Sequence, residues 1–249
     1  MKFLFTAGLL ALVMISRMAA QDSLLTLAPK TGFTMKTIEG GRFLMGAPEK
    51  VLERDDDECQ YLDSVPSFKI GVFEVTQADW RSIVGKYPDT MPFVCDQCPM
   101  INVSWNDIQI FLEYLNAKTG QQYRLPTETE WEFAAKGGNL SRGFVYAGSN
   151  DIAQSGWYVQ NAMFTPQPVG QKIANELGLY DMSGNVWEWC QNTYTPYPCD
   201  TTTSGPNKSR VIRGGSWLSN IVLRTTVRSY NGAYTRSVDL GFRLAQTIR

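Results

Sequence analysis

Complete helix signals, each with a start, an apolar pattern and a stop, occur in only two stretches of this chain. Residues 104–107 (Ser-Trp-Asn-Asp) resemble a capping box, and an apolar stripe with helical spacing follows at Ile108, Phe111, Leu112 and Leu115 before Gly120. Residues 127–130 (Thr-Glu-Thr-Glu) form a capping box, and the short helix predicted from it stops at residues 137–138 (Gly-Gly). The remainder up to the C-terminus shows no helical periodicity and predicts strands and long loops.

Strand signals occur nearer the N-terminus. Residues 40–46 read as a strand between turns, and residues 65–75 alternate less cleanly and run into a plausible helix start at 76–79. Glycine and proline are spread along the chain, and we find no internal repeat or low-complexity linker. The pattern predicts an α+β fold with loop-rich connections and few short helices. We assign residues 21–249 to a single domain, whose folded part begins near Thr26.

The first twenty residues read as a signal peptide. Lys2 supplies a positive start, residues 3–15 are apolar but too short to span a bilayer, and Ala19 and Ala20 precede the expected cleavage site. Met18 occupies a position where a small residue is preferred, so a retained N-terminal anchor is the alternative. No other apolar run has membrane length. We expect export to the periplasm, the cell surface or the medium, and no membrane span.

Charge and residue types exclude several functions. The 23 basic residues nearly balance the 24 acidic ones, which gives no electrostatic reason to expect nucleic acid as a partner. Histidine is absent, so imidazole catalysis and metal sites that need histidine ligands are excluded. Export permits disulfides among the five cysteines. We expect Cys190 to pair with Cys199 and two of the other three (Cys59, Cys95 and Cys98) to pair together.

Five motifs carry a family resemblance when they are taken together in this order. They lie at 103–107, at 124–132, at 184–189, at 213–217 (Arg-Gly-Gly-Ser-Trp) and at 241–243 (Gly-Phe-Arg). The joint pattern resembles the formylglycine-generating enzyme (sulfatase-modifying factor) family and covers residues 40–245. The resemblance implies a C-type-lectin-like fold, and it does not by itself imply activity.

The resemblance also implies that catalysis is lost. Active members carry two cysteines, five residues apart, that bind copper(I) after the Gly-Gly-Ser-aromatic motif, because soft thiolates select that ion. The matching positions hold Ser219 and Arg224, and no cysteine follows Cys199. We therefore expect no catalytic residues, no copper and no enzymatic activity. A formylglycine-generating oxidase that acts on a cysteine thiol is the alternative.

One metal site of the family has matching residues here. The resemblance implies a structural calcium ion held by Asp181, Gly184, Val186 and Glu188, an oxygen set that suits a hard cation. The alternative is that Glu188 pairs with an arginine and Asp181 begins a turn.

The segment 212–245, here called the C-terminal tract, has an unusual composition. It contains five arginines but no Lys, Glu, Gln, Met, Pro, Cys or His. Between scaffold-like residues lie fifteen positions that all belong to the set reachable from an asparagine codon by changing its two adenines: Ile212, Leu218, Ser219, Asn220, Ile221, Val222, Leu223, Val227, Ser229, Tyr230, Asn231, Tyr234, Ser237, Val238 and Asp239. The tract resembles that of the exported variable proteins of diversity-generating retroelements, known from spirochaetes.

These observations predict a monomeric, non-catalytic protein that binds an external ligand through those fifteen side chains, and we expect this ligand to be a protein. Tyrosine with small polar residues suits such a face, because tyrosine gives large contact area at low entropic cost. Two alternatives remain: the tract packs as core strands, or it belongs to a fixed component of a cell-envelope complex. The several arginines argue against a wholly buried run.

Overall fold

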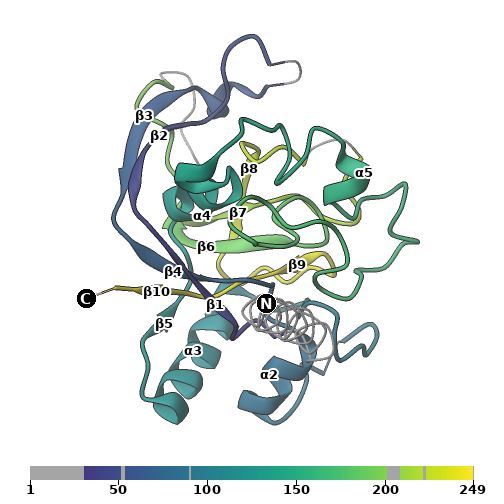
Figure 1. Ribbon diagram of the computed structural model, residues 1–249. Coiled ribbons are helices and arrows are strands. Elements are labelled where there is room, and N and C mark those ends of the chain that lie inside the picture. Colours follow the sequence, from purple (N-terminus) through teal and green to yellow (C-terminus); the bar gives the residue numbers. More distant parts are fainter. Residues whose placement is uncertain (1–30, 52–53, 90, 201–207, 221–222, 249) are drawn as a thin grey trace, which may run out of the picture. The chain divides into compact units, whose positions relative to one another are not determined.

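The two predicted capping boxes both open helices in the computed structural model, which describes residues 31–51, 54–89, 91–200, 208–220 and 223–248 (Figure 1). Helix α3 (Trp105–Thr119) begins where Ser104 Oγ accepts a hydrogen bond from Asp107 N, and it ends at Gly120 with φ of 67°. Helix α4 (Glu128–Ala135) is capped in the same way by Thr127. Helix α2 (Gln77–Val84) confirms the weaker start at 76–79.

The described strands form three sheets. In the first, β4 (Phe68–Gly71) lies between the N-terminal β1 (Met35–Ile38) and the C-terminal β10 (Ala245–Thr247), and β10 also pairs with β5 (Tyr123–Arg124). The second is the antiparallel pair β2 (Gly41–Met45) and β3 (Tyr61–Val65). The third has the order β8, β7, β6, β9, with the bounds Arg228–Gly232, Ser209–Arg213, Trp187–Thr193 and Leu240–Gly241.

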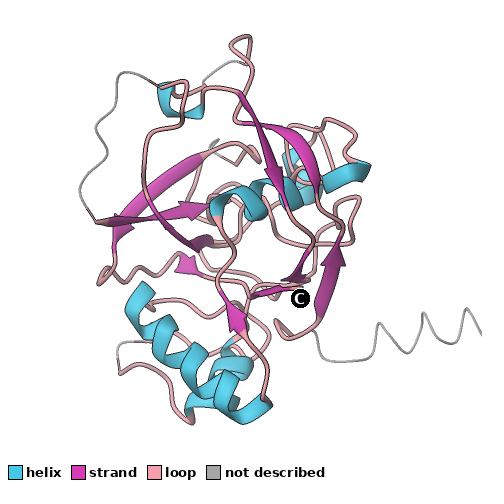
Figure 2. Ribbon diagram, turned by 90° about the vertical axis from the view of Figure 1, so that its left-hand side faces the viewer, coloured by secondary structure: helices cyan, strands magenta, loops and turns pink. Residues whose placement is uncertain are grey.

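Apolar side chains join these layers. Helices α2 and α3 pack side by side at the lower end of the view (Figure 2), and their Trp80 and Phe111 rings stack with centroids 5.0 Å apart. Phe242 meets the edges of both rings, which ties the Gly-Phe-Arg motif to the helices. Trp131 of α4 is fully buried in a second cluster with Phe68 and Ile70 of the first sheet.

Three single turns appear that the sequence pattern did not predict. They are α5 (Ile152–Ser155) and the 3-10 turns η1 (Asp56–Glu58) and η2 (Gly138–Leu140). Asp151 caps α5 by accepting from Ala153 N at 3.0 Å. Each element is too short to show a periodic apolar pattern, so periodicity does not predict it.

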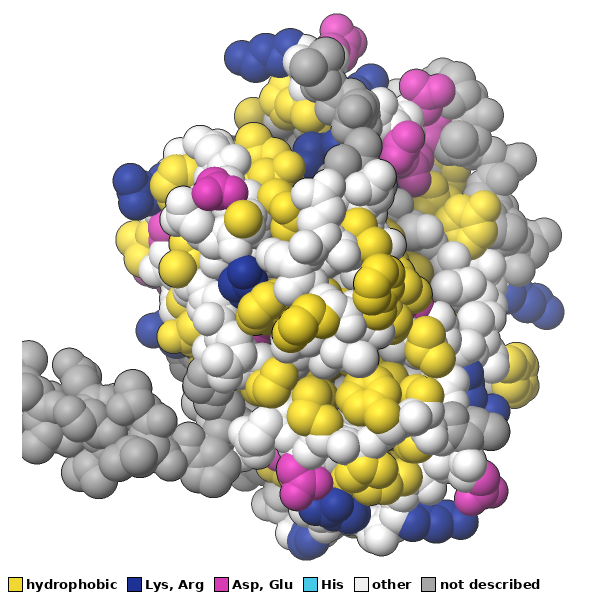
Figure 3. Space-filling model, turned by 90° about the vertical axis from the view of Figure 1, so that its right-hand side faces the viewer, with side chains coloured by type: hydrophobic (Ala, Val, Ile, Leu, Met, Phe, Trp, Pro, Cys, Tyr) yellow, Lys and Arg dark blue, Asp and Glu magenta, His cyan; other side chains and the backbone are white. Residues whose placement is uncertain are grey.

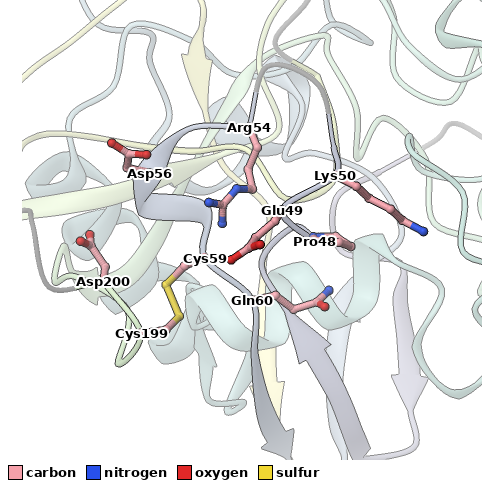
Figure 4. Close-up of a pocket in the computed structure, with 9 residues that line it drawn as sticks. All are labelled: Pro48, Glu49, Lys50, Arg54, Asp56, Cys59, Gln60, Cys199 and Asp200. Carbon is pink, nitrogen blue, oxygen red and sulfur yellow. A yellow bond between two sulfur atoms is a disulfide. The ribbon is translucent and has the colours of Figure 1, made fainter.

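The disulfide prediction was partly wrong. Cys199 pairs with Cys59, 140 residues away, and Cys95 pairs with Cys98. Cys190 is instead a free thiol, fully buried on β6, and its burial raises the pKa of the thiol well above its usual value. The Cys59–Cys199 bond borders a polar cleft (Figure 4). Structural disulfides are typical of proteins outside the cytosol. The predicted signal peptide lies outside the described residues and stays a prediction.

Residues from Thr31 onward form one compact unit. None of the helices in the described ranges is long and apolar enough to cross a membrane.

Candidate binding face of the C-terminal tract

The C-terminal tract supplies the last residues of β7, all of β8 and β9, and the loops between them. Its five arginines each form an ion pair with a carboxylate outside the tract. The pairs are Arg213 with Glu132, Arg224 with Glu58, Arg228 with Glu128, Arg236 with Asp107, and Arg243 with Glu188. The tract is therefore fixed to the scaffold by charges at five points.

The expectation that arginines mark an exposed tract was wrong for four of the five. Arg213, Arg224, Arg228 and Arg243 are all less than a tenth exposed. Burial is possible because each guanidinium meets a carboxylate, and Arg228 and Arg243 each form two bonds with one carboxylate. Only Arg236 lies at the surface, where it binds Asp107.

Arg213 also holds the backbone of the tract. Its guanidinium donates to the carbonyl oxygens of Thr225, Thr226 and Val227 at 3.1, 2.9 and 2.8 Å. Its carboxylate partner Glu132 is fully buried, and burial by itself raises the pKa of Glu132. Nearby Lys136 and Arg213 outweigh that effect and lower the pKa below its usual value, so the pair is charged. The segment 225–227 is thus fixed by one buried side chain.

Three of the fifteen predicted binding residues are buried in the core, which corrects the prediction for them. Ile212 is 4% exposed, and Leu223 and Val227 are each 1% exposed. Ile212 lies on β7, between β6 and β8 in the third sheet, and packs in the same cluster as Trp189 and Leu240. These side chains are therefore not available to a ligand. Their codon type did not distinguish them, because apolar core residues belong to the same codon set.

Ten of the fifteen predicted residues reach the surface. The exposed side chains are Leu218, Asn220, Tyr230, Tyr234 and Val238, and the half-buried ones are Ser219, Ser229, Asn231, Ser237 and Asp239. Tyr234 is the most exposed at 85%, and Tyr230 is 44% exposed. Ile221 and Val222 lie outside the described residues.

The backbone beneath these side chains is anchored. Ala233 O accepts from Asn106 N at 3.3 Å, and Ser237 O accepts from Asn102 N at 2.9 Å. Ser216 Oγ donates to Asp239 Oδ2 at 2.8 Å, which connects the Gly-Gly-Ser motif to the end of the loop. The path of the loop 233–239 is therefore fixed at these three points.

Two apolar side chains beside the tract were missed by sequence reasoning. Met163 and Phe164 are 76% and 73% exposed, and both have left-handed backbone conformations with φ of 50° and 58°. Their loop meets the tract where Val159 N donates to Ser219 O at 3.1 Å. Hydrophobic side chains gather on the face toward α5 and β9 (Figure 3). No periodic pattern surrounds Met163 and Phe164, so the sequence offered no signal for them.

The four residues of the predicted calcium site lie together around the turn before β6. Gly184 has φ of 89°, as the predicted sharp turn requires, and Asp181 Oδ2 accepts from Gly170 N at 2.6 Å. Both Glu188 oxygens accept from Arg243 at 2.6 Å, and one also accepts from Trp131 Nε1 at 2.8 Å. A cation at Glu188 would therefore compete with Arg243, so this arrangement does not fit the Glu188 carboxylate as a metal ligand. Among the described side chains, no acidic or cysteine cluster is arranged to hold a metal.

The two positions predicted to match the copper-binding cysteines have other partners. Ser219 Oγ accepts from Ser216 N at 3.0 Å. Arg224 Nη2 lies 2.7 Å from Glu58 Oε1, and Thr226 Oγ1 donates to the other oxygen of Glu58 at 2.6 Å. Both side chains hold the loop of the tract in place.

Comparison with known proteins gives the family of this chain. The sequence profile of the sulfatase-modifying factor enzyme 1-like domain matches residues 22–248. The chain belongs to this family. Among similar proteins, the chaperone protein LppX of Paenibacillus barcinonensis is 31% identical over 74% of this chain and 81% of its own length. The inactive C-alpha-formylglycine-generating enzyme 2 of Mus musculus is 30% identical over 86% and 85%.

Solved structures show the same fold for this member of the sulfatase-modifying factor family. Treponema denticola variable protein 1 superposes with a TM-score of 0.75 at 26% identity, over 85% of this chain and 94% of that one. PvdO from Pseudomonas aeruginosa gives 0.73 at 25% identity, over 89% and 99%. The predicted α+β, C-type-lectin-like fold of the formylglycine-generating type is confirmed.

Proposed function

We propose that this family member is a non-catalytic protein that binds an external protein through the exposed side chains of its C-terminal tract. One observation carries the proposal: the tract is fixed by five ion pairs, while ten of its fifteen codon-restricted residues reach the surface. A rigid backbone that presents interchangeable side chains suits recognition, because little ordering entropy is lost on binding.

The comparisons support the proposal. A relative that is similar over most of its length is named as an inactive formylglycine-generating enzyme, and a structure with the same fold is named as a variable protein. Ser219 and Arg224 also support the absence of oxidase chemistry, because a hydroxyl and a guanidinium do not replace two thiolates at a copper(I) site. We extend the proposal to export, to a monomeric state and to diversification of the tract by a retroelement.

Diversification can be tested in the surrounding DNA. We expect a near-identical template repeat, with adenines at the codons of the fifteen residues, beside a gene for a reverse transcriptase. The codons of the four buried arginines (Arg213, Arg224, Arg228 and Arg243) should not vary between independent isolates, because their ion pairs fix the backbone. A locus without template or reverse transcriptase would mean a binding protein of fixed specificity.

Absence of catalysis is tested by incubating the purified protein with copper(I) and a cysteine-containing sulfatase-type peptide. No formylglycine above a no-protein control is expected, as measured by mass spectrometry. Copper-dependent turnover would favour the oxidase alternative.

A further inference from the structure

A second recessed surface lies away from the exposed side chains of the C-terminal tract. It is a cleft of about 680 Å³ between β2, the segment 46–51 that follows it, the end of α4 and the loop 143–145. The buried residues Arg224, Thr225 and Thr226 also line it. This volume lies within the range of small-molecule sites, which is roughly 300–1,000 Å³.

One part of the wall of this cleft is apolar. Leu44 and Val145 line it while 53% and 43% exposed, which leaves apolar surface open to solvent. Phe43 and Phe133 also line it and meet edge to face with ring centroids 5.1 Å apart. An apolar chain that entered the cleft would cover Leu44 and Val145, and the removal of this surface from water favours binding.

The charged residues of the cleft have one sign. Arg42, Lys50, Lys136 and Arg224 line it, and none of its lining residues is acidic. Lys136 is held by Glu132 and by the carbonyl oxygens of Leu44 and Gly46, and Arg224 is held by Glu58.

Arg42 and Lys50 are exposed, and neither forms an ion pair with any residue that the structure describes. The Lys50 side chain extends away from the Cys59–Cys199 disulfide (Figure 4). The cleft therefore combines an apolar wall with two cations that are available to an anion.

We propose that this cleft binds a single-chain amphiphile with an anionic head, of the alkyl carboxylate class. The chain lies along Leu44, Phe43 and Val145, and the carboxylate is bound by Arg42 and Lys50. Charge complementarity selects this occupant, because a cationic head would meet the unpaired charges of Arg42 and Lys50, and a neutral head would leave both of them unused. The site is separate from the proposed ligand face, since none of the exposed tract side chains lines it.

Calorimetric titration of the purified protein with three amphiphiles of equal chain length tests the proposal. Decanoate carries the anionic head, decyl glucoside the neutral head and decyltrimethylammonium the cationic head, each below its micelle concentration. We expect saturable decanoate binding that is roughly tenfold tighter than that of the other two, which corresponds to about 1.4 kcal/mol. Equal binding of all three, or no saturable decanoate binding, would overturn the proposal.

Variants of the cleft test where decanoate binds. The double change Arg42→Gln and Lys50→Gln should weaken decanoate binding by roughly tenfold, whereas Lys36→Gln with Lys69→Gln removes two exposed lysines from β1 and β4 and should change nothing. Val145→Glu places a carboxylate in the apolar wall at an exposed position, so it should abolish binding while the melting curve stays intact. Decanoate affinity that is unchanged in both Arg42→Gln/Lys50→Gln and Val145→Glu would contradict the site.

Failure here is distinguishable from failure of the proposed function. Replacement of Tyr230 and Tyr234 by serine should leave decanoate binding unchanged, because neither side chain lines the cleft. A loss of decanoate binding in that variant would contradict the separation of the two sites.

Discussion

Arg228 and Glu128 form a buried ion pair in which Nε and Nη2 of the arginine each lie 2.8 Å from a different carboxylate oxygen. Tyr230 follows Arg228 by two positions in β8, so its side chain lies on the same face of the strand, and it reaches the surface. Both side chains contact Tyr194: the Arg228 guanidinium carbon lies 4.4 Å from its ring centroid, and the Tyr230 centroid lies 4.6 Å away. One short strand thus carries an anchor and a displayed side chain next to each other.

The buried pair Arg228–Glu128 should contribute far more to the free energy of unfolding than the exposed pair Arg236–Asp107. Arg228→Gln removes the two-bond partner of buried Glu128 and leaves Arg213, at 3.7 Å, as its nearest cation, so we expect a loss of about 3 kcal/mol in the free energy of unfolding. Arg236→Gln breaks a pair whose arginine is 49% exposed, so the loss should be below about 1 kcal/mol. Urea denaturation of both variants measures the contrast. Similar losses in the two proteins would contradict the anchoring role of Arg228.

The displayed side chains should be replaceable together. Tyr230→Asn, Asn231→Ser, Tyr234→Ser and Val238→Ser all stay within the same codon set, and the quadruple variant should lose no more than about 2 kcal/mol, at about 0.5 kcal/mol for each surface change.

Single changes at buried scaffold residues provide the comparison for this quadruple variant. Trp217→Ala and Phe242→Ala should each cost about 3–5 kcal/mol, because each opens a cavity in the core. Chemical denaturation measures all three proteins. A quadruple variant as damaged as Trp217→Ala would show that the tract is structural.

Acid should weaken the contact between α4 and the tract. The folded-state pKa of Glu132 is lowered, so its stabilisation is present above the pKa of an unfolded glutamate, about 4.3, and is lost as the pH falls through the folded-state pKa. Glu132→Gln should be less stable than the wild type at pH 7, by about 3–5 kcal/mol, and should lose less stability below pH about 4.

Unfolding free energies from pH 7 to pH 3 test the expectation for Glu132. The control is Glu113→Gln, which alters an exposed glutamate on α3 and should keep the acid profile of the wild type. Parallel profiles for the wild type and Glu132→Gln would argue against this role.

The family resemblance and the structure differ on calcium, because the resemblance implies the ion while Arg243 already binds both oxygens of Glu188. If Asp181, Gly184, Val186 and Glu188 bind the ion, calcium in hundredfold excess over its Kd adds about 2.7 kcal/mol, and a chelator should lower the melting temperature by several degrees. Glu188→Gln also breaks the pair with Arg243, so its lower melting temperature alone is uninformative. The informative quantity is the difference between calcium and chelator, which should vanish in the variant. Identical wild-type curves in both conditions would leave Glu188 as the partner of Arg243 alone.

The sequence by itself determined the two capped helices α3 and α4 and the family. Ser104 and Thr127 cap their helices through hydrogen bonds to residues three positions away, so a few consecutive letters are enough to predict them. The family motifs, which include residues 184–189 and 213–217, could also be recognised from the sequence because they are short and occur in a fixed order.

Only the tertiary structure decided which side chains of the tract are displayed. Ile212 and Tyr234 belong to the same codon set, yet one is 4% exposed and the other 85%. Partners in space are distant in sequence. Glu128 lies 100 residues from Arg228 in the buried ion pair, and Cys59 lies 140 residues from Cys199 in the disulfide. Capping depends on neighbours along the chain, whereas burial and ion pairing depend on neighbours in space, which are defined only once the sheets have assembled.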